Sequence, residues 1–367
     1  MSCKSTRRDF LTGRILSNAT GDESPPSRPS NVSEGSAEGQ SIETYLMRVA
    51  RQAMACEFEV VFNAGQYPDD AQAALEALDL VQSLEEQLSL FRPTSELSRI
   101  NREAARQPVR VEPQLFELLE LTFQISRETQ GAYDITATPL WEVWGFSRRA
   151  GRVPSREELA DARRNVGSDL VQLDPERKTV QFRRPGVRLS LGSIGKGYAL
   201  DCCARRLAAA GIGDYLFHAG QSSVLACGSR VGVDGRPCHA LGGWSVAIRD
   251  PLHQHRLLAE VWLRNRALGT SGTSFQYFRH KGRRYGHVID PRTGWPAEGV
   301  LQATVLAPTA AQADALSTAL FVMGPDAAEQ YCRAHPEIGA ILLCPAQSTT
   351  QVRLYAMGVG ETELALR

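Results

Sequence analysis

The chain has 367 residues, enough for one large domain or two closely packed ones, and its 43% hydrophobic and 22% charged residues exclude a largely disordered or fibrous protein. Lysine plus arginine and aspartate plus glutamate both total 41, so the net charge is zero and argues against nucleic acid or an anionic membrane as a partner. No apolar run reaches the ~18 residues of a transmembrane helix, and the eight cysteines include no Cys-x-x-Cys pair that predicts a zinc site.

The beginning of the chain is polar and has no predicted core. Residues 5–11 read Ser-Thr-Arg-Arg-Asp-Phe-Leu, which resembles a twin-arginine export signal. Such a signal needs an apolar stretch of about 7–15 residues after the arginines, and residues 12–18 are too polar for one. Residues 21–40 have almost no apolar side chain to offset the entropy of ordering. We therefore predict a disordered arm over residues 1–41, a folded domain over residues 42–365, and a cytoplasmic location in preference to export.

The first elements of the folded part have clear periodicities. In residues 55–63 apolar and polar side chains alternate and β-branched side chains are frequent, which predicts a strand. Residues 69–90 predict a long helix, and residues 112–130 predict a second one that Gly131 ends. The apolar stripe of the first helix consists of Leu75, Leu78, Val81, Leu84 and Leu88.

The rest of the chain mixes helices and strands. Pro185-Gly186 predicts a hairpin turn between short strands at 179–182 and 187–191. Further strands are expected at 224–227, 244–248, 257–263, 302–306 and 338–343, and a helix is expected at 197–210. Another helix is expected at 309–323, with Thr309 and Gln312 as a capping box and Gly324 beyond its end. This order predicts an α+β or mixed α/β fold with helices packed on largely antiparallel sheets.

A phosphate site is predicted where a strand runs into a helix. Residues 189–198 pass through small side chains into that helix, whose unpaired N–H groups and partial positive charge favour an anion. Lys196 adds a full charge at the same place. Taken alone, Lys196 is better explained as a solvated helix cation.

Three more segments hold groups suited to chemistry. Residues 287–294 combine His287 with an acid and a Pro-to-Gly turn, and residues 131–136 follow a helix. Asp314 and Thr318 are four residues apart, so their oxygens share a helical face and suit Mg²⁺. Each has a plain structural alternative: a hydrogen-bonded histidine for His287, and a local hydrogen bond for the helical pair.

Seven segments together, in this order, resemble the ApbE-type FAD:protein FMN transferases over residues 45–360. The family pattern His-Ile-Ile-Asp-Pro-Arg-Thr-Gly reads here His-Val-Ile-Asp-Pro-Arg-Thr-Gly, and Ala-Asp-Ala-Leu-Ser-Thr-Ala is identical. The matching segments are Met54-Ala55-Cys56, Ser89-Leu90-Phe91 with residues 95–101, residues 131–136, residues 190–198, Thr270-Ser271-Gly272, residues 287–294 and residues 313–319.

The resemblance implies a two-lobed, T-fold-like architecture with FAD between the lobes and Mg²⁺ on its diphosphate. It implies His287 as the catalytic group. The implied metal ligands are Ser193, through its carbonyl, and Asp314 and Thr318. The residues implied at the FAD are Met54, Phe91, Ala132, Tyr133, Asp134, Ser190, Lys196 and Val288. The implied reaction moves FMN from FAD to a threonine of an acceptor protein, of the kind found in electron-transfer systems, and releases AMP.

The chain also departs from the family pattern. Ser190 stands where the family has an aspartate, and Gln221-Ser222-Ser223 replaces a Gly-containing turn. Losing the aspartate is expected to weaken FAD binding. The bulkier turn is expected to restrict the access of the acceptor protein to the site. These changes leave two alternatives open: an FAD pyrophosphatase that yields FMN and AMP, and a flavin-binding protein without turnover.

Overall fold

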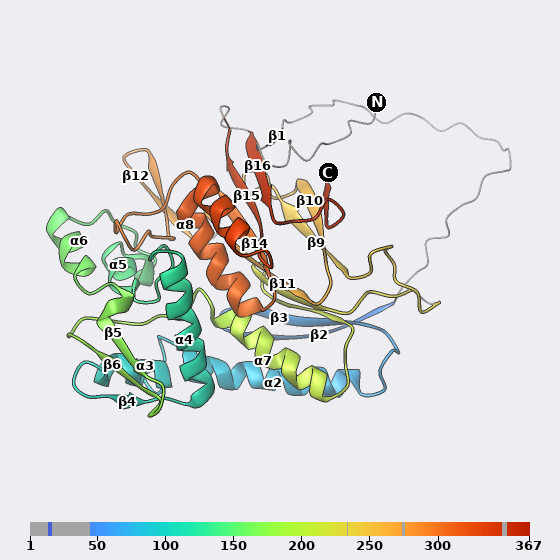
Figure 1. Ribbon diagram of the computed structural model, residues 1–367, viewed down its shortest axis with the longest axis horizontal. Coiled ribbons are helices and arrows are strands. Elements are labelled where there is room, and N and C mark those ends of the chain that lie inside the picture. The colour runs from blue at the N-terminus through green and yellow to red at the C-terminus, as the bar shows by residue number, and fades with distance from the viewer. Residues whose placement is uncertain (1–13, 17–44, 233, 274–275, 347–350) are drawn as a thin grey trace.

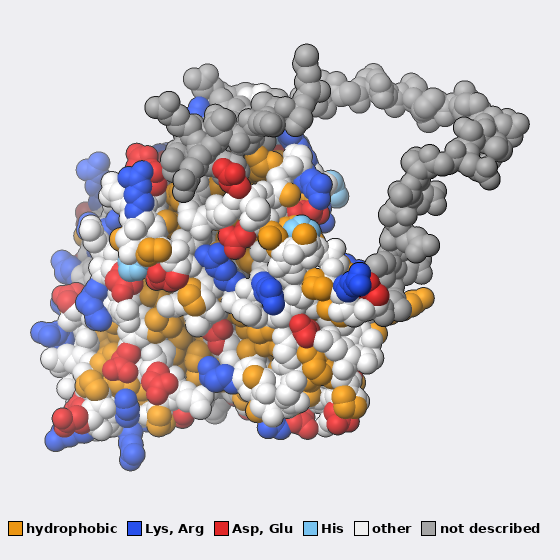
Figure 2. All heavy atoms as spheres, turned by 45° about the vertical axis from the view of Figure 1, so that its right-hand side comes forward, with side chains coloured by type: hydrophobic (Ala, Val, Ile, Leu, Met, Phe, Trp, Pro, Cys, Tyr) orange, Lys and Arg blue, Asp and Glu red, His pale blue; other side chains and the backbone are white. Residues whose placement is uncertain are grey.

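The computed structural model describes residues 14–16, 45–232, 234–273, 276–346 and 351–367. The predicted arm, residues 1–41, lies outside this set except for β1 (Arg14–Leu16), which pairs antiparallel with β16 (Val352–Met357). None of the described helices is long and apolar enough to cross a membrane. Over the face shown in Figure 2, basic and acidic side chains are interspersed.

An antiparallel sheet of nine strands forms the centre of the fold (Figure 1), in the order β1-β16-β15-β14-β11-β8-β7-β3-β2. The central strands are buried on both faces, which explains why β15 is an unbroken apolar run. Besides β1 and β16, the strands are β2 (Leu46–Ala53), β3 (Cys56–Asn63), β7 (Tyr215–Ala219), β8 (Ser223–Cys227), β11 (Arg266–Gly272), β14 (Gln302–Ala307) and β15 (Gly339–Pro345).

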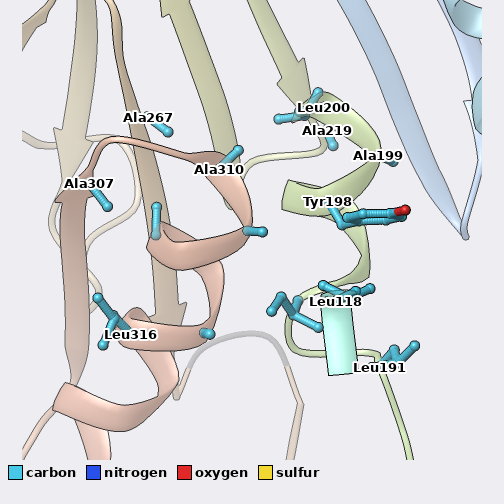
Figure 3. Close-up of a cluster of buried hydrophobic side chains, with 14 of the residues drawn as sticks. Leu118, Leu191, Tyr198, Ala199, Leu200, Ala219, Ala267, Ala307, Ala310 and Leu316 are labelled. Atoms are coloured by element: carbon cyan, nitrogen blue, oxygen red, sulfur yellow. The ribbon is translucent and has the colours of Figure 1, made fainter. Parts of the chain in front are cut away.

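Both faces of this sheet are covered. One face packs on α2 (Asp70–Leu88), α7 (Gly195–Ala209) and α8 (Ala310–Ala334), which form the largest core. Figure 3 shows side chains of α7 and α8 in this core, among them Tyr198 and Leu316. The other face packs on a three-stranded sheet and forms a second core. The strands of this small sheet are β9 (Trp244–Arg249), β10 (Leu257–Leu263) and β17 (Leu364–Leu366).

A second lobe stands beside this sandwich. It contains the helices α3 (Glu96–Glu103), α4 (Pro113–Glu128), α5 (Thr138–Val143) and α6 (Arg156–Arg163) and the short 3₁₀ turns η1 (Phe146–Arg148) and η2 (Ser168–Leu170). Its strands are β4 (Val109–Arg110), β5 (Val171–Asp174), β6 (Thr179–Phe182), β12 (Tyr277–His280) and β13 (Arg283–Gly286).

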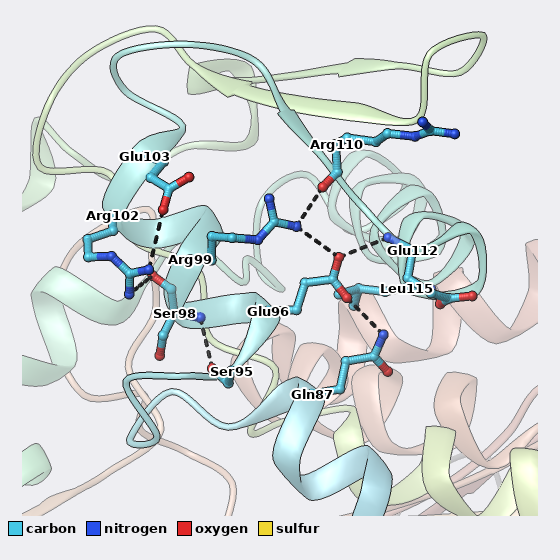
Figure 4. A network of polar contacts seen from close by, with 10 residues as sticks. All are labelled: Gln87, Ser95, Glu96, Ser98, Arg99, Arg102, Glu103, Arg110, Glu112 and Leu115. Atoms are coloured by element: carbon cyan, nitrogen blue, oxygen red, sulfur yellow. Dashed lines mark hydrogen bonds and ion pairs between the residues drawn. The ribbon is translucent and has the colours of Figure 1, made fainter.

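One carboxylate ties the second lobe to α2. Glu96 accepts from the Arg99 guanidinium at 3.3 Å, from the Glu112 backbone N–H at 2.9 Å and from the Gln87 side chain at 2.9 Å (Figure 4). Gln87 belongs to α2, Arg99 to α3, and Glu112 is the N-cap of α4. The segment 95–101, a family motif in the sequence, therefore has a structural use as the joint between three helices.

The predicted fold class is confirmed, and most predicted elements are present. The expected helices at 69–90, 112–130 and 197–210 correspond to α2, α4 and α7, and Gly131 follows α4 with a φ of +75°. The five strands expected between 224 and 343 correspond to β8, β9, β10, β14 and β15.

The predicted hairpin around Pro185-Gly186 is wrong. β6 pairs with β5 and β4, while residues 187–191 form no strand. The backbone of Leu189 is instead held by the Asn101 side chain, which donates to its carbonyl at 2.9 Å and accepts from its N–H at 2.7 Å. The amide side chain of Asn101 thus takes the place of a partner strand for Leu189. From there the chain continues into α7 without forming a strand.

Two predicted helix details also need correction. Leu75 is 42% exposed, because α2 turns Ala73, Ala74 and Ala77 toward the core in its place. The late helix does not stop at Gly324: that residue has a φ of +78° and makes a kink, after which Pro325 opens a second helical segment. Thr309 caps α8, accepting from the Gln312 N–H at 3.2 Å, but the Gln312 side chain accepts from the Thr309 hydroxyl at 3.2 Å and the expected capping box is only half formed.

A glycine lets α7 and α8 touch through their backbones. A Cβ placed on Gly197 would lie 2.1 Å from the Ala310 carbonyl oxygen, which is impossible without moving one of the helices. Gly195, two residues earlier on α7, has open space around its Cβ position. Gly197 therefore fixes how closely the first turns of the two helices approach.

We predict that Gly197→Ala lowers the free energy of unfolding by about 2 kcal/mol, because a side chain forced against backbone cannot be accommodated by a rotamer change. Gly195→Ala is the matched control, and it should leave stability unchanged or raise it by about 0.5 kcal/mol. Chemical denaturation measures both. Equal effects of the two substitutions would contradict the close approach of the helices.

Candidate active site

Asp314 is the centre of the polar cluster between α7 and α8. It is 6% exposed, and its two carboxylate oxygens accept from the Gly197 N–H and from the Ser223 hydroxyl, both at 2.7 Å. Gly197 is the third residue of α7, so its N–H is one of those that a helix start leaves without a partner in the same helix. Asp314 supplies that partner.

A second carboxylate makes the reverse contact. Asp201, on α7, accepts from the backbone N–H groups of Ala310 at 2.8 Å and Ala311 at 2.9 Å, the first residues of α8. Each helix therefore carries the carboxylate that caps the start of the other. Burial raises the pKa of Asp201 to about 6. The sequence reading missed this residue, although an acid on the mostly buried face of α7 was a usable signal.

Lys196 lies at the same helix start. Its ammonium donates to the Ser222 hydroxyl, and the Ser222 and Ser223 hydroxyls are 3.4 Å apart. Burial raises the pKa of Asp314 to about 7, and the nearby charge of Lys196 opposes this shift without cancelling it. At neutral pH the Asp314 carboxylate is therefore poorly stabilised by the protein itself, and an additional cation would stabilise it.

Thr318 extends the cluster along α8. Its hydroxyl lies 3.1 Å from the Ser271 hydroxyl, which in turn lies 2.8 Å from that of Ser317. Ionised Asp314 has further lone pairs beyond the two used by Gly197 and Ser223. One carboxylate with several neutral oxygens suits Mg²⁺, which shares its coordination with substrate phosphates. Among the described residues there is no cluster of three or more His, Cys, Asp or Glu side chains that could hold a metal ion.

The loop before α7 meets the turn after α4. The Ser193 hydroxyl donates to the Tyr133 hydroxyl at 3.3 Å, and Tyr133 is 1% exposed, so burial raises its pKa and keeps it neutral. Ala132 is also buried. Asp134 accepts from the N–H and hydroxyl of Thr136 at 2.8 and 2.6 Å, and burial raises its pKa. These bonds give Asp134 a turn-forming role in this structure.

Ser190 and Met54 border the same cluster. The Ser190 hydroxyl accepts from the Gly192 N–H at 3.4 Å. Met54 sits in the β2–β3 turn with a φ of +48°, and its N–H donates to Glu85 at 2.8 Å. Burial raises the pKa of Cys56 at the end of this turn; the charge of Lys196 opposes this shift and that of Asp314 adds to it. Phe91, after α2, is 72% exposed and stands on the surface.

His287 follows directly after β13 in the second lobe. Its Nδ1 is 3.1 Å from the Gln276 carbonyl oxygen, and since a carbonyl only accepts, Nδ1 bears the proton and Nε2 has the free lone pair. Burial lowers the pKa of His287, so the ring is neutral at pH 7. The next residue, Val288, packs against the main core, and its carbonyl accepts from Ala297 at 2.9 Å.

The structure brings some of the predicted site residues together and, within its described part, shows no direct contact of others with them. Lys196 lies in the first turn of α7, Ser193 lies two residues before that helix, and Asp314 and Thr318 lie on α8. No hydrogen bond or ion pair between described residues joins His287, Val288 or Phe91 to this cluster, although the Arg292 side chain lies 3.7 Å from the Cβ position of Gly131. Sequence reasoning missed the supporting hydroxyl groups of Ser222, Ser223, Ser271 and Ser317.

The sequence model of the ApbE family matches residues 54–342. The FAD:protein FMN transferase of Haemophilus influenzae is 30% identical over 296 residues, which cover 78% of this chain and 83% of that protein. One of Klebsiella pneumoniae is 34% identical over 269 residues, covering 71% and 72%. The flavin transferase ApbE from Vibrio cholerae has a TM-score of 0.74 at 27% identity, covering 86% of this chain and 98% of that one.

The ApbE protein of Thermotoga maritima gives a similar result, with a TM-score of 0.72 at 27% identity over 82% of this chain and 94% of that one. Fold and relatives together define an enzyme of the transferase class. The chain belongs to the ApbE family, and the resemblance of its seven segments is confirmed.

The raised pKa of Asp314 predicts how stability depends on pH. A carboxyl whose pKa is about 7 in the folded state and near 3.8 otherwise binds more protons when folded, so the free energy of unfolding falls as pH rises between those values. We predict that metal-free Asp314→Asn, measured in chelator, lacks this loss and is more stable than wild type at pH 8 by about 1–3 kcal/mol.

Asp326→Asn is the matched control, because Asp326 is exposed on the same helix and should leave the pH profile of the wild type unchanged. Urea unfolding at several pH values gives the comparison. An Asp314→Asn protein that is less stable than wild type at pH 8 would show that the ionised carboxylate stabilises the fold, contrary to this prediction.

Proposed function

We propose that this chain transfers FMN from FAD to a threonine hydroxyl of an acceptor protein, releases AMP, and requires Mg²⁺. The observation that carries the proposal is Asp314: a buried carboxylate, incompletely neutralised, that accepts from the Gly197 N–H and lies near Lys196 at the start of α7. That arrangement suits a diphosphate bridged by a divalent cation. The names of the curated relatives supply the substrate, FAD, and the transferred group, FMN.

Binding of FAD follows from the charges at this helix start. The first turn of α7 and Lys196 would attract the diphosphate, and Asp314, Thr318 and the Ser193 carbonyl would hold Mg²⁺. The ion would supply positive charge beside the phosphate oxygens. The β2–β3 turn at Met54, together with Phe91, Ala132, Tyr133, Asp134, Ser190 and Val288, forms the proposed surroundings of the nucleotide.

His287 is the proposed general base. Its neutral Nε2 takes the proton of the threonine hydroxyl as that oxygen bonds to the phosphorus of the FMN part of FAD. The bond between this phosphorus and the bridging oxygen breaks, and AMP leaves with the bridging oxygen. The Nδ1–H bond to Gln276 fixes the ring in the tautomer that this step needs.

We predict that Asp314→Ala lowers the rate of flavinylation by about 10³-fold and Thr318→Ala by about tenfold, because losing a charged ligand costs more than losing a neutral one. In-gel fluorescence of a flavinylated acceptor protein measures the rate. Full activity of Asp314→Ala would disprove the metal assignment.

Incubation with FAD and Mg²⁺ but without acceptor separates transfer from the alternatives. A transferase releases AMP slowly under these conditions. Rapid appearance of AMP and free FMN would instead identify an FAD pyrophosphatase, with water in place of threonine. Retained FAD and no AMP, even with acceptor present, would identify a flavin-binding protein without turnover.

We predict that His287→Asn slows flavinylation by about 10²–10⁴-fold. For wild type at saturating Mg²⁺, the rate should rise with pH and level off, with a midpoint below 6.5, because burial lowers the pKa of the base from that value. His255→Asn, in an exposed loop, is the control and should behave as wild type. A midpoint well above 7 would remove His287 from this role.

A further inference from the structure

Two segments that are far apart in the sequence meet beside His287. Residues 146–152 follow α5, and residues 276–286 form the β12–β13 hairpin. They touch at Gly151, where a Cβ would lie 2.2 Å from the Phe278 ring. Between them is a hollow of about 370 Å³, lined by Phe146, Arg149, Gly151, Gln276, Tyr277 and Phe278. We call these two segments and their hollow the hairpin surface.

The hollow is directly connected to the proposed base. The Gln276 carbonyl accepts from His287 Nδ1 at 3.1 Å, and the Gln276 side chain donates to the Phe146 carbonyl at 3.0 Å. Gln276 thus forms part of the wall of the hollow and also orients the histidine. One residue that lines the hollow is therefore in direct hydrogen-bond contact with His287.

The hairpin surface is strongly basic, although the protein as a whole has no net charge. The two segments contain seven cations and no carboxylate: Arg148, Arg149, Arg152, Arg279, Lys281, Arg283 and Arg284. Neighbouring acids pair with two of them: Glu158 with Arg152 at 2.8 Å and Glu298 with Arg283 at 2.5 Å. Folding thus places these cations together on one surface, which the zero net charge of the whole chain does not reveal.

The backbone and rings of the hairpin suit an extended chain. β12 and β13 form a sheet of two strands, so within the described residues one edge of each strand has no strand partner. Such an edge can accept an added strand. Tyr277 is 47% exposed, and the Arg284 guanidinium lies 3.7 Å from the centre of its ring. Aromatic rings beside arginines are typical anchors at protein interfaces.

We propose that the hairpin surface docks an extended, acidic segment of the acceptor protein and delivers its threonine to His287. This inference rests on the proposed transfer to a threonine and adds the recognition chemistry of the partner. Acidic side chains flanking the threonine pair with Arg149 and Arg279, while the segment's apolar side chains enter the hollow. Electrostatic complementarity of this kind supplies both selectivity and rapid association.

The test compares short fluorescent peptides with a central threonine, flanked by glutamate, by glutamine or by lysine. Fluorescence anisotropy measures their binding to wild type, to the double variant Arg149→Glu with Arg279→Glu, and to Arg249→Glu. Arg249 is an exposed arginine of β9, on the small sheet, and serves as the matched control. Thermal melts establish that all three proteins are folded.

We expect the acidic peptide to bind wild type most tightly and to lose affinity in high salt. The double variant should bind it about tenfold more weakly, with the control unchanged, and the same variant should raise the KM for acceptor but not for FAD. The proposal is overturned if the double variant binds like wild type, if the three peptides bind equally, or if single-stranded DNA displaces the peptide more effectively than unlabelled acidic peptide.

Failure of the docking surface and failure of the transferase proposal give different results. Selective, arginine-dependent binding without any FMN transfer would retain the surface and reject the transferase. Transfer whose KM for acceptor is insensitive to the double variant would retain the transferase and reject the surface.

Discussion

The exchange of carboxylates between α7 and α8 is the interaction on which the rest of the site depends. Asp201 binds the start of α8, and Asp314 binds the start of α7. Helix starts have N–H groups that no residue of the same helix can satisfy, and a carboxylate is a strong acceptor for them. The two contacts together fix both the spacing and the rotation of the helices, so Lys196 and Thr318 are placed by the same bonds that set how the helices pack.

In this arrangement the groups around Asp314 do not fully compensate the negative charge of its carboxylate. Its neighbours are an N–H, a hydroxyl and a lysine whose ammonium contacts Ser222, and burial still raises its pKa to about 7. A carboxylate retained in such surroundings lowers the stability of the ligand-free protein. Binding of a cation reverses this effect, because the ion stabilises the charged form. Burial of Asp314 therefore lowers the stability of the ligand-free protein and raises its affinity for a cation.

Much of the fold was predictable from the sequence because long elements with one buried face leave a periodic pattern. α2, α4 and β15 are such elements. β2 was missed because this edge strand has Arg51 on its half-buried side and Ala50 on its exposed side, so polar and apolar residues do not alternate in its sequence. The failure at residues 187–191 has another origin: the partner of Leu189 is the side chain of Asn101, and a side chain that replaces a strand cannot be read from local pattern.

The charged and polar groups of the candidate site could be predicted from the sequence, but the residues that hydrogen-bond to them could not. Asp314, Thr318 and Lys196 stand in recognisable motifs, whereas Ser222 and Ser223 were read only as added bulk in a departing turn. In the structure these two hydroxyls contact Lys196 and Asp314, so the turn supplies hydrogen bonds to both charged groups.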